Sequence, residues 1–183
     1  MDDLTTGTVG NLVFSRALDH PGLLAAPVAD ALARLEDADE VGVAEIDPAV
    51  ADTAAFCGRY GVRPDESANC VIVAARREGV TRFAACVVLA TTRADVNGVV
   101  RRRLGARKAS FASMEEAIFQ TGMEHGGITP IGLPVGWPLF LDTAVSRHRR
   151  VVVGSDLRTS KLALPGRVLA SLPSAEVVER LGR

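Results

Sequence analysis

The sequence predicts a single α/β domain with a mixed sheet, and three observations support this. The chain has 183 residues, the usual size of one compact domain. Apolar residues make up 48% and charged residues 23%, a globular balance that excludes a disordered or fibrous protein. Segments with helical periodicity alternate with apolar runs rich in Val and Ile, without a repeat or a low-complexity linker. We expect one domain over 23–183, preceded by an arm or short leading element over 1–22.

The first third of the chain predicts two helices with a strand between them. A helix is expected over about 27–36, with proline in its first turn, and a strand over 41–46. Asp47 is expected to cap the second helix and Pro48 to begin it. Gly61 is expected to end it.

The middle of the chain predicts a pair of central strands followed by two helices. The strands are the continuous apolar runs Asn69 to Ala75 and Phe83 to Ala90. Asp95 can cap a helix that ends at Gly105. Ser113 opens a further helix through a capping box with the glutamate three residues later.

The last third combines a loop with short elements. Residues 121–138 are so rich in Gly and Pro that we expect a structured loop rather than a helix or central strand. Short strands are expected over 138–141, 150–154 and 160–164, and Pro165 can open a last helix.

The formal net charge of −1 hides an uneven distribution of charge. Residues 1–60 carry 11 acidic and 3 basic side chains, whereas residues 61–183 carry 11 acidic and 18 basic ones, so their net charges are −8 and +7. The basic part can mark a polyanion-binding surface, or the two parts can be two differently solvated faces. With only 6 Phe, 1 Trp and 1 Tyr, an aromatic platform for stacking bases is not expected.

Several common chemistries lack their motifs in this chain. It contains no G-x-G-x-x-G, P-loop, G-x-S-x-G or H-E-x-x-H pattern. Its three cysteines form no C-x-x-C pair and its three histidines have no ligand spacing, so we expect no metal and no cofactor. Because the sequence has neither a signal-peptide pattern nor an apolar stretch of helical membrane length, we expect a soluble, cytoplasmic protein with no membrane partner.

The loop Gly126 to Pro130, called the glycine loop below, is the best candidate site. Glycines let backbone N–H groups approach a ligand closely, so such a loop can form an oxyanion hole or hold a ribose or carboxyl group. The alternative is a tight crossover turn whose glycines only relieve steric strain. The turn Gly154-Ser155 can likewise bind a phosphate or hydroxyl group, or can be only a hairpin.

A cluster of basic residues lies on and just beyond the helix that Asp95 caps. Taken alone it is a solvated face, but if its members meet other basic segments in space they can form a nucleic-acid surface. The members are Arg101, Arg102, Arg103, Arg107 and Lys108.

In this order, the residues resemble the YbaK/EbsC family of aminoacyl-tRNA deacylases, which is related to the editing domain of prolyl-tRNA synthetases. The resemblance extends from about Pro27 to Val178. It rests on the helix and strand through Ile46, the strand Asn69 to Val73, the helix Asp95 to Leu104, the glycine loop as a G-x-x-x-P motif, Asp142 after a short strand, and the Gly154-Ser155 turn.

The resemblance implies a curved mixed sheet with a barrel-like core flanked by helices. It also implies hydrolysis, in trans, of amino acids wrongly esterified to tRNA, without a cofactor or a side-chain nucleophile. Main-chain donors would then orient the ester and stabilise the oxyanion. The implied partner is a mischarged aminoacyl-tRNA, with an aminoacyl-tRNA synthetase as a further candidate.

Carried over residue by residue, the resemblance assigns roles to three groups. The catalytic group is Asn69, Gly127 and Thr129; the substrate-binding group is Gly126, Ile128, Pro130, Asp142, Gly154, Ser155 and Arg158; the tRNA-binding group is Arg101, Arg102, Arg103, Arg107 and Lys108.

The chain departs from the family pattern at two positions. The family usually has a lysine in its first central strand, where this chain has Asn69, so the expected cation is missing. Asp156 replaces a glycine that is common in the late turn. Two alternatives therefore stand beside the deacylase: a non-catalytic module that binds tRNA or a nucleotide, and a hydrolase of small acylated molecules.

Overall fold

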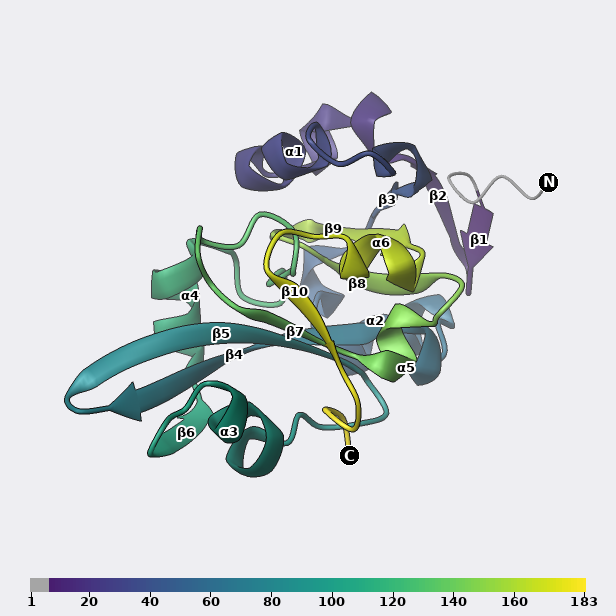
Figure 1. Ribbon diagram of the computed structural model, residues 1–183. Coiled ribbons are helices and arrows are strands. Elements are labelled where there is room, and N and C mark those ends of the chain that lie inside the picture. The colour runs from purple at the N-terminus through teal and green to yellow at the C-terminus, as the bar shows by residue number, and fades with distance from the viewer. Residues whose placement is uncertain (1–6) are drawn as a thin grey trace.

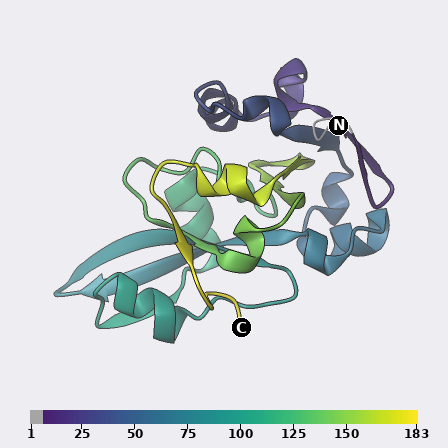
Figure 2. The same ribbon diagram turned by 45° about the vertical axis from the view of Figure 1, so that its right-hand side comes forward.

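A computed structural model describes residues 7–183, which form two five-stranded sheets that curl toward each other (Figures 1 and 2). The first sheet has the order β1 (Gly7–Val9), β2 (Leu12–Arg16), β3 (Gly42–Glu45), β9 (Leu157–Leu164), β8 (Val151–Ser155). The second has the order β10 (Ala175–Val178), β7 (Leu139–Asp142), β5 (Val80–Leu89), β4 (Ala68–Arg77), β6 (Lys108–Phe111). Because β7 runs parallel to β5 and β10 while the other neighbours are antiparallel, the predicted mixed sheet is confirmed.

The two sheets meet at one corner, and this corner positions the candidate site. Ser67, which directly precedes β4, forms a parallel bridge with Val152 in β8. The start of β4 therefore lies beside β8, although the two are far apart in the sequence.

Six α-helices in the described part of the chain flank the sheets. They are α1 (Ala26–Leu32), α2 (Thr53–Tyr60), α3 (Arg101–Arg103), α4 (Met114–Thr121), α5 (Thr143–Ser146) and α6 (Gly166–Ala170). In Figure 1, α1 lies above the first sheet and α3 lies below the second, so the two helices cover opposite ends of the molecule.

The largest core fills the space between the sheets. It draws buried side chains from strands of both sheets and from α1 and α6, among them Val28, Val43, Ile72, Val87, Leu141, Leu162 and Leu169. Two smaller clusters lie on the outer faces, one under α2 and one under the segment 96–104. Most strands are thus covered on both faces, which explains their continuous apolar runs.

The predicted second helix is broken into two pieces. Asp47 caps only a 3-10 turn, Pro48–Val50, and Asp52 then caps α2. Gly61 ends α2 in the left-handed conformation, with φ +64°, as the sequence predicts. The break places the backbone of Ala51 at the edge of the candidate site, which one continuous helix would not do.

The two helices predicted from their caps both form. Asp95 accepts a hydrogen bond from the Gly98 N–H at 2.9 Å, but it caps a π-helix, Val96–Val100, that continues into α3. The Ser113 hydroxyl accepts from the Glu116 N–H at 3.1 Å and caps α4 as predicted.

Several short elements have no counterpart among the predicted ones. They are the β1–β2 hairpin, the edge strand β6, the helix α5 and the last strand β10. The hairpin belongs to the expected leading segment over 1–22, and β2 pairs with β3, so from residue 7 onward this segment continues the first sheet. Residues 1–6 of that segment lie outside the described residues.

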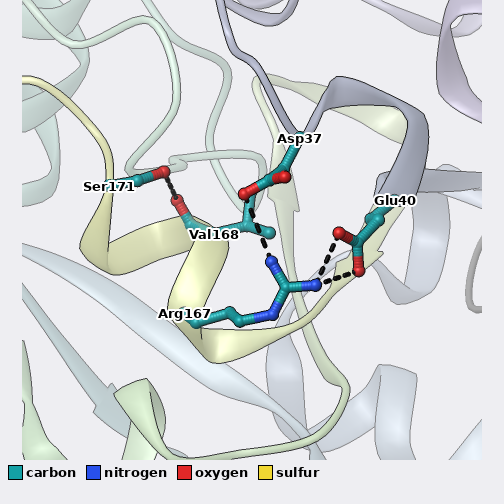
Figure 3. Close-up of polar contacts among 5 residues, drawn as sticks. All are labelled: Asp37, Glu40, Arg167, Val168 and Ser171. Atoms are coloured by element: carbon teal, nitrogen blue, oxygen red, sulfur yellow. Dashed lines mark hydrogen bonds and ion pairs between the residues drawn. The ribbon is translucent and has the colours of Figure 1, made fainter.

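Ion pairs attach α6 to the connection between α1 and β3 (Figure 3). Arg167 donates to Asp37 at 3.2 Å and to Glu40, while the Ser171 hydroxyl donates to the Val168 carbonyl at 2.9 Å. Because these groups are largely exposed, the pairs add little to the stability of the fold. Within residues 7–183, no helix has the length and apolar character needed to cross a bilayer.

Candidate functional site

A pocket of about 210 Å³ lies at the corner where the sheets meet. Its wall is formed by the first turn of α2, the start of β4, strands β8 and β9, and the glycine loop. Most of the lining is apolar, and the polar side chains are few: Asp52, Thr53, Ser67, Asn69, His125 and Lys161.

The glycine loop packs backbone against backbone on the β8–β9 turn. A Cβ atom on Gly127 would lie 2.2 Å from the Asp156 carbonyl oxygen, and one on Gly154 would lie 2.4 Å from the Gly127 carbonyl oxygen. Both positions therefore require glycine. Asp156 itself has φ +75°, a left-handed conformation that favours glycine.

Hydrogen bonds fix the peptide planes of this loop. The Gly127 N–H donates to the Glu124 carbonyl at 2.9 Å, and the Gly127 carbonyl accepts from the Asp156 N–H at 2.8 Å. In a trans peptide the C=O and the next N–H point in opposite directions, so the Ile128 N–H is directed away from the β8–β9 turn. It has no acceptor among the described residues and can therefore donate to a bound ligand.

Asn69 presents an oriented amide at the start of β4. Its Oδ1 accepts a hydrogen bond from the Thr53 hydroxyl at 2.5 Å. In this orientation the two Nδ2 protons remain for a ligand.

The pocket contains a cation that sequence reasoning missed. Lys161 lies in β9 with only 5% of its surface exposed, and its Nζ donates to the carbonyls of Ala51 at 2.7 Å and Gly126 at 2.9 Å. Burial lowers the pKa of this ammonium from its ordinary value to about 8. The only signal in the sequence was a lysine within an apolar strand, which alone does not show the face to which it points.

No side chain of the pocket is an activated nucleophile. Burial raises the pKa of the Cys70 thiol far above its ordinary value, so the thiol stays protonated at neutral pH. His125 is exposed, and its Nδ1 lies 3.4 Å from Arg158. Within residues 7–183, no three His, Cys, Asp or Glu side chains form a group that could hold a metal ion.

The structure brings some of the predicted site residues together and leaves others apart. Asn69, Gly126, Ile128 and Gly154 line the pocket, and Gly127 lies directly behind its wall. The remaining predicted residues are not part of the wall: Thr129, Pro130, Asp142, Ser155 and Arg158.

The polar groups outside the wall are engaged in local structure. The buried Thr129 hydroxyl accepts from the Ile131 N–H at 3.4 Å, and the Ser155 hydroxyl donates to the Ser160 carbonyl at 2.8 Å. Asp142 caps α5 and also accepts from the Gly182 N–H at 2.7 Å.

Arg158 holds the start of the glycine loop from outside the pocket lining. Its guanidinium donates to the His125 carbonyl and to the Pro48 carbonyl, each at 2.6 Å. Like Lys161, it therefore ties the segment before the glycine loop to the segment before α2.

A second hollow, of about 580 Å³, gathers part of the predicted basic cluster at the edge strand β6. Arg101, Arg107 and Lys108 line it together with Arg76, and no acidic residue lines it. Arg103 instead pairs with Glu176, whereas Arg102 is exposed outside this lining.

A third hollow borders the pocket on the side of the edge strand β6. It shares Asn69 and Val71 with the pocket, and it is also lined by Arg93 and by Phe111, the last residue of β6. The guanidinium of Arg93 lies 4.9 Å from the centre of the Phe111 ring. Since strands rise about 3.3 Å per residue, Phe111 and the basic end of β6 are about 10 Å apart.

Comparison with known families and structures agrees with this geometry. Residues 47–172, which include the whole pocket lining, match the aminoacyl-tRNA editing domain family. Comparison with curated protein sequences gives no match.

Three solved structures share the fold. A proposed trans-editing enzyme for prolyl tRNA synthetase is 20% identical, with a TM-score of 0.69 over 84% of this chain and 93% of that one. The hypothetical protein APE2540 is 22% identical, with a TM-score of 0.64 over 73% and 85% of the two chains. A scaffold protein from computational epitope grafting is 19% identical, with a TM-score of 0.70 over 85% and 95%. At these identities the likeness confirms the predicted fold class and no more.

Proposed function

Because the chain belongs to the family of aminoacyl-tRNA editing domains, we propose that it is a trans-acting hydrolase that deacylates mischarged tRNA. The observation that carries this proposal is the pocket itself: it lies inside the family-matched segment and it combines an unpaired loop N–H with an oriented amide. The alternatives remain outcomes of the experiment below.

The size of the pocket supports an aminoacyl group as the bound moiety. A volume of about 210 Å³ is smaller than the roughly 300–1,000 Å³ of pockets for drug-sized ligands. An amino acid fits such a space, and the adenosine that carries it would remain at the mouth. The apolar side chains Phe56, Val71, Ile128 and Val153 in the wall favour an uncharged, compact amino acid side chain.

The reaction requires a water molecule and donors for an oxyanion. The oxygen of water bonds to the ester carbonyl carbon, the bond from that carbon to the ribose oxygen breaks, and a proton from water passes to the ribose oxygen. The Ile128 N–H and the Asn69 amide are the donors that would stabilise the oxyanion. An aminoacyl ester is already activated, so orientation and oxyanion stabilisation suffice without a side-chain nucleophile.

The basic hollow along β6 would hold the phosphates of the tRNA. Arg76, Arg101, Arg107 and Lys108 supply four positive charges there, and Arg93 lies between them and the pocket. Such contacts depend on salt and carry no sequence information. The low number of aromatic residues fits binding through phosphates rather than through stacked bases.

A panel of tRNAs charged with correct and incorrect amino acids tests the proposal. We expect the purified protein to release the amino acid from at least one mischarged tRNA faster than buffer does and to leave its correctly charged counterpart intact. No acceleration with any pair would refute the enzymatic function. Tight tRNA binding without ester loss would identify a binding module, and equal activity on free aminoacyl-adenosine would identify a hydrolase of small acylated molecules.

A further inference from the structure

Lys161 is the one buried basic side chain among residues 7–183. It lies in the middle of β9, paired with Ala44 of β3 on one side and with Gly154 of β8 on the other. An ammonium is costly to bury unless protein groups replace its water. Among the described residues no carboxylate lies within ion-pair distance of it, and two backbone carbonyls take that place.

The two carbonyls belong to two segments that pack against each other beside the pocket. Ala51 lies at the break before α2, and Gly126 opens the glycine loop, so the ammonium joins two segments that are 75 residues apart. On a third side, Nζ lies 5.5 Å from the centre of the Phe56 ring. The two carbonyls accept from two of the three N–H donors of the ammonium.

The bond to Gly126 controls the orientation of the loop. The peptide between Gly126 and Gly127 is held from both sides, by Lys161 at its carbonyl and by the Glu124 carbonyl at its N–H. The next peptide carries the Ile128 N–H. Its own carbonyl, that of Gly127, accepts from the Asp156 N–H at 2.8 Å. Lys161 therefore anchors the first of two linked planes, and the Asp156 N–H anchors the second, which presents the Ile128 N–H.

We propose that Lys161 is a positioning residue of the editing site, whose positive charge holds the glycine loop in the conformation that presents the Ile128 N–H to the acyl ester. The proposal rests on the editing function above and adds the residue that regulates it. Loss of the proton weakens both charge-assisted bonds, so the loop loosens and the hydrolysis slows.

The surroundings of Lys161 set the pH at which this occurs. The titratable and charged groups that face it are Asp52 and Cys57 from the α2 side, Arg158 on its own strand, and His125 directly before the glycine loop. Burial is the main cause that lowers its pKa to about 8, Arg158 acts in the same direction, and Asp52 and Cys57 act against it.

This arrangement separates activity from stability. Since the pKa in the folded state is below that of an unfolded lysine, this group makes the fold more stable as the pH rises above about 8. Over the same pH range the editing rate should fall. A lysine with only a structural role would not produce these opposite trends.

The main test measures deacylation between pH 6.5 and 9.5, after subtraction of the buffer rate. We expect the wild-type rate to fall above about pH 8, and Lys161→Met to be at least tenfold slower at pH 7 without that fall. Arg82→Met, which removes a charge from the exposed β4–β5 hairpin, is the matched control and should behave as wild type. Equal rates and profiles for Lys161→Met and wild type would overturn the proposal.

A second variant keeps the lysine. Asp52→Asn preserves an N-cap residue but removes a charge that raises the pKa of Lys161, so the fall in activity should move to lower pH. An unchanged profile would contradict the proposed role, even if Lys161→Met does not fold.

A spectroscopic test distinguishes failure of this inference from failure of the editing function. The chain has only two lysines, so ¹⁵N-lysine labelling gives two Nζ signals. The amide signals of Gly127 and Ile128 should shift with the same pH midpoint as the Lys161 Nζ signal. If they do not move, Lys161 does not position the loop; if they move while no tRNA is hydrolysed, the function is wrong and the positioning is right.

Discussion

Replacement of Gly127 by alanine should destabilise the protein strongly. The new Cβ would lie 2.2 Å from the Asp156 carbonyl oxygen and 2.6 Å from its carbon, and backbone atoms cannot rotate away as a side chain can. The loop must move, which weakens the 2.8 Å bond from the Asp156 N–H to the Gly127 carbonyl and its 3.1 Å neighbour from the Glu124 N–H. Overpacking costs about 1–3 kcal/mol and each lost bond about 1 kcal/mol, so we expect a loss of about 2–5 kcal/mol.

Urea unfolding and thermal melting measure this loss. For a chain of this size, the expected decrease in Tm is roughly 4–20 °C. Gly58→Ala is the matched control, because Gly58 lies within α2 with no atom within 4 Å of its would-be Cβ. That substitution should stabilise the protein by about 0.5–1 kcal/mol through helix propensity. If Gly127→Ala is as stable as wild type, the loop does not pack on the β8–β9 turn as described.

Three further predictions concern binding and reactivity. The double substitution Arg107→Ala and Lys108→Ala should weaken the binding of all tRNAs alike and reduce the slope of log K against log salt concentration by about 1–2. Binding titrations at several salt concentrations measure this slope. An unchanged slope would show that the tRNA binds elsewhere. Treatment with iodoacetamide at pH 7 should leave the deacylation rate unchanged, because burial keeps the Cys70 thiol protonated. Rapid loss of activity together with alkylation of Cys70 would contradict this. Thr53→Val should lower the deacylation rate several-fold by freeing the Asn69 amide from its 2.5 Å bond, and a rate equal to wild type would show that this bond does not orient the amide.

The sequence predicts much of the fold because its signals are local. The two central strands follow from the apolar runs that form β4 and β5, and the capping box at Ser113 marks the start of α4. The strand β6, Lys108–Phe111, is not predicted because it is short and half of its residues are polar. Only its pairing with β4 makes it a strand. The break at Ala51 escapes for a similar reason, since both Asp47 and Asp52 are good caps.

The candidate site is predicted less completely, because a pocket depends on which segments meet in space. Glycine at position 127 correctly indicates a close backbone approach, but the neighbour is the backbone of Asp156 rather than open space for a ligand. Lys161, from another strand, places a cation in the same pocket as Asn69. No local pattern shows that the side chains of Lys161 and Asn69 line the same pocket, since 92 positions separate them.

The central claim is that this pocket hydrolyses the aminoacyl ester. The most direct test is to measure single-turnover ester loss from a mischarged tRNA with wild type and with Asn69→Ala. The predicted result is that wild type accelerates ester loss over buffer and that Asn69→Ala, with tRNA affinity retained, is slower by about 10²-fold, the usual cost of removing one oxyanion donor. A wild-type rate equal to that of buffer, or equal rates for the two proteins, would contradict the account.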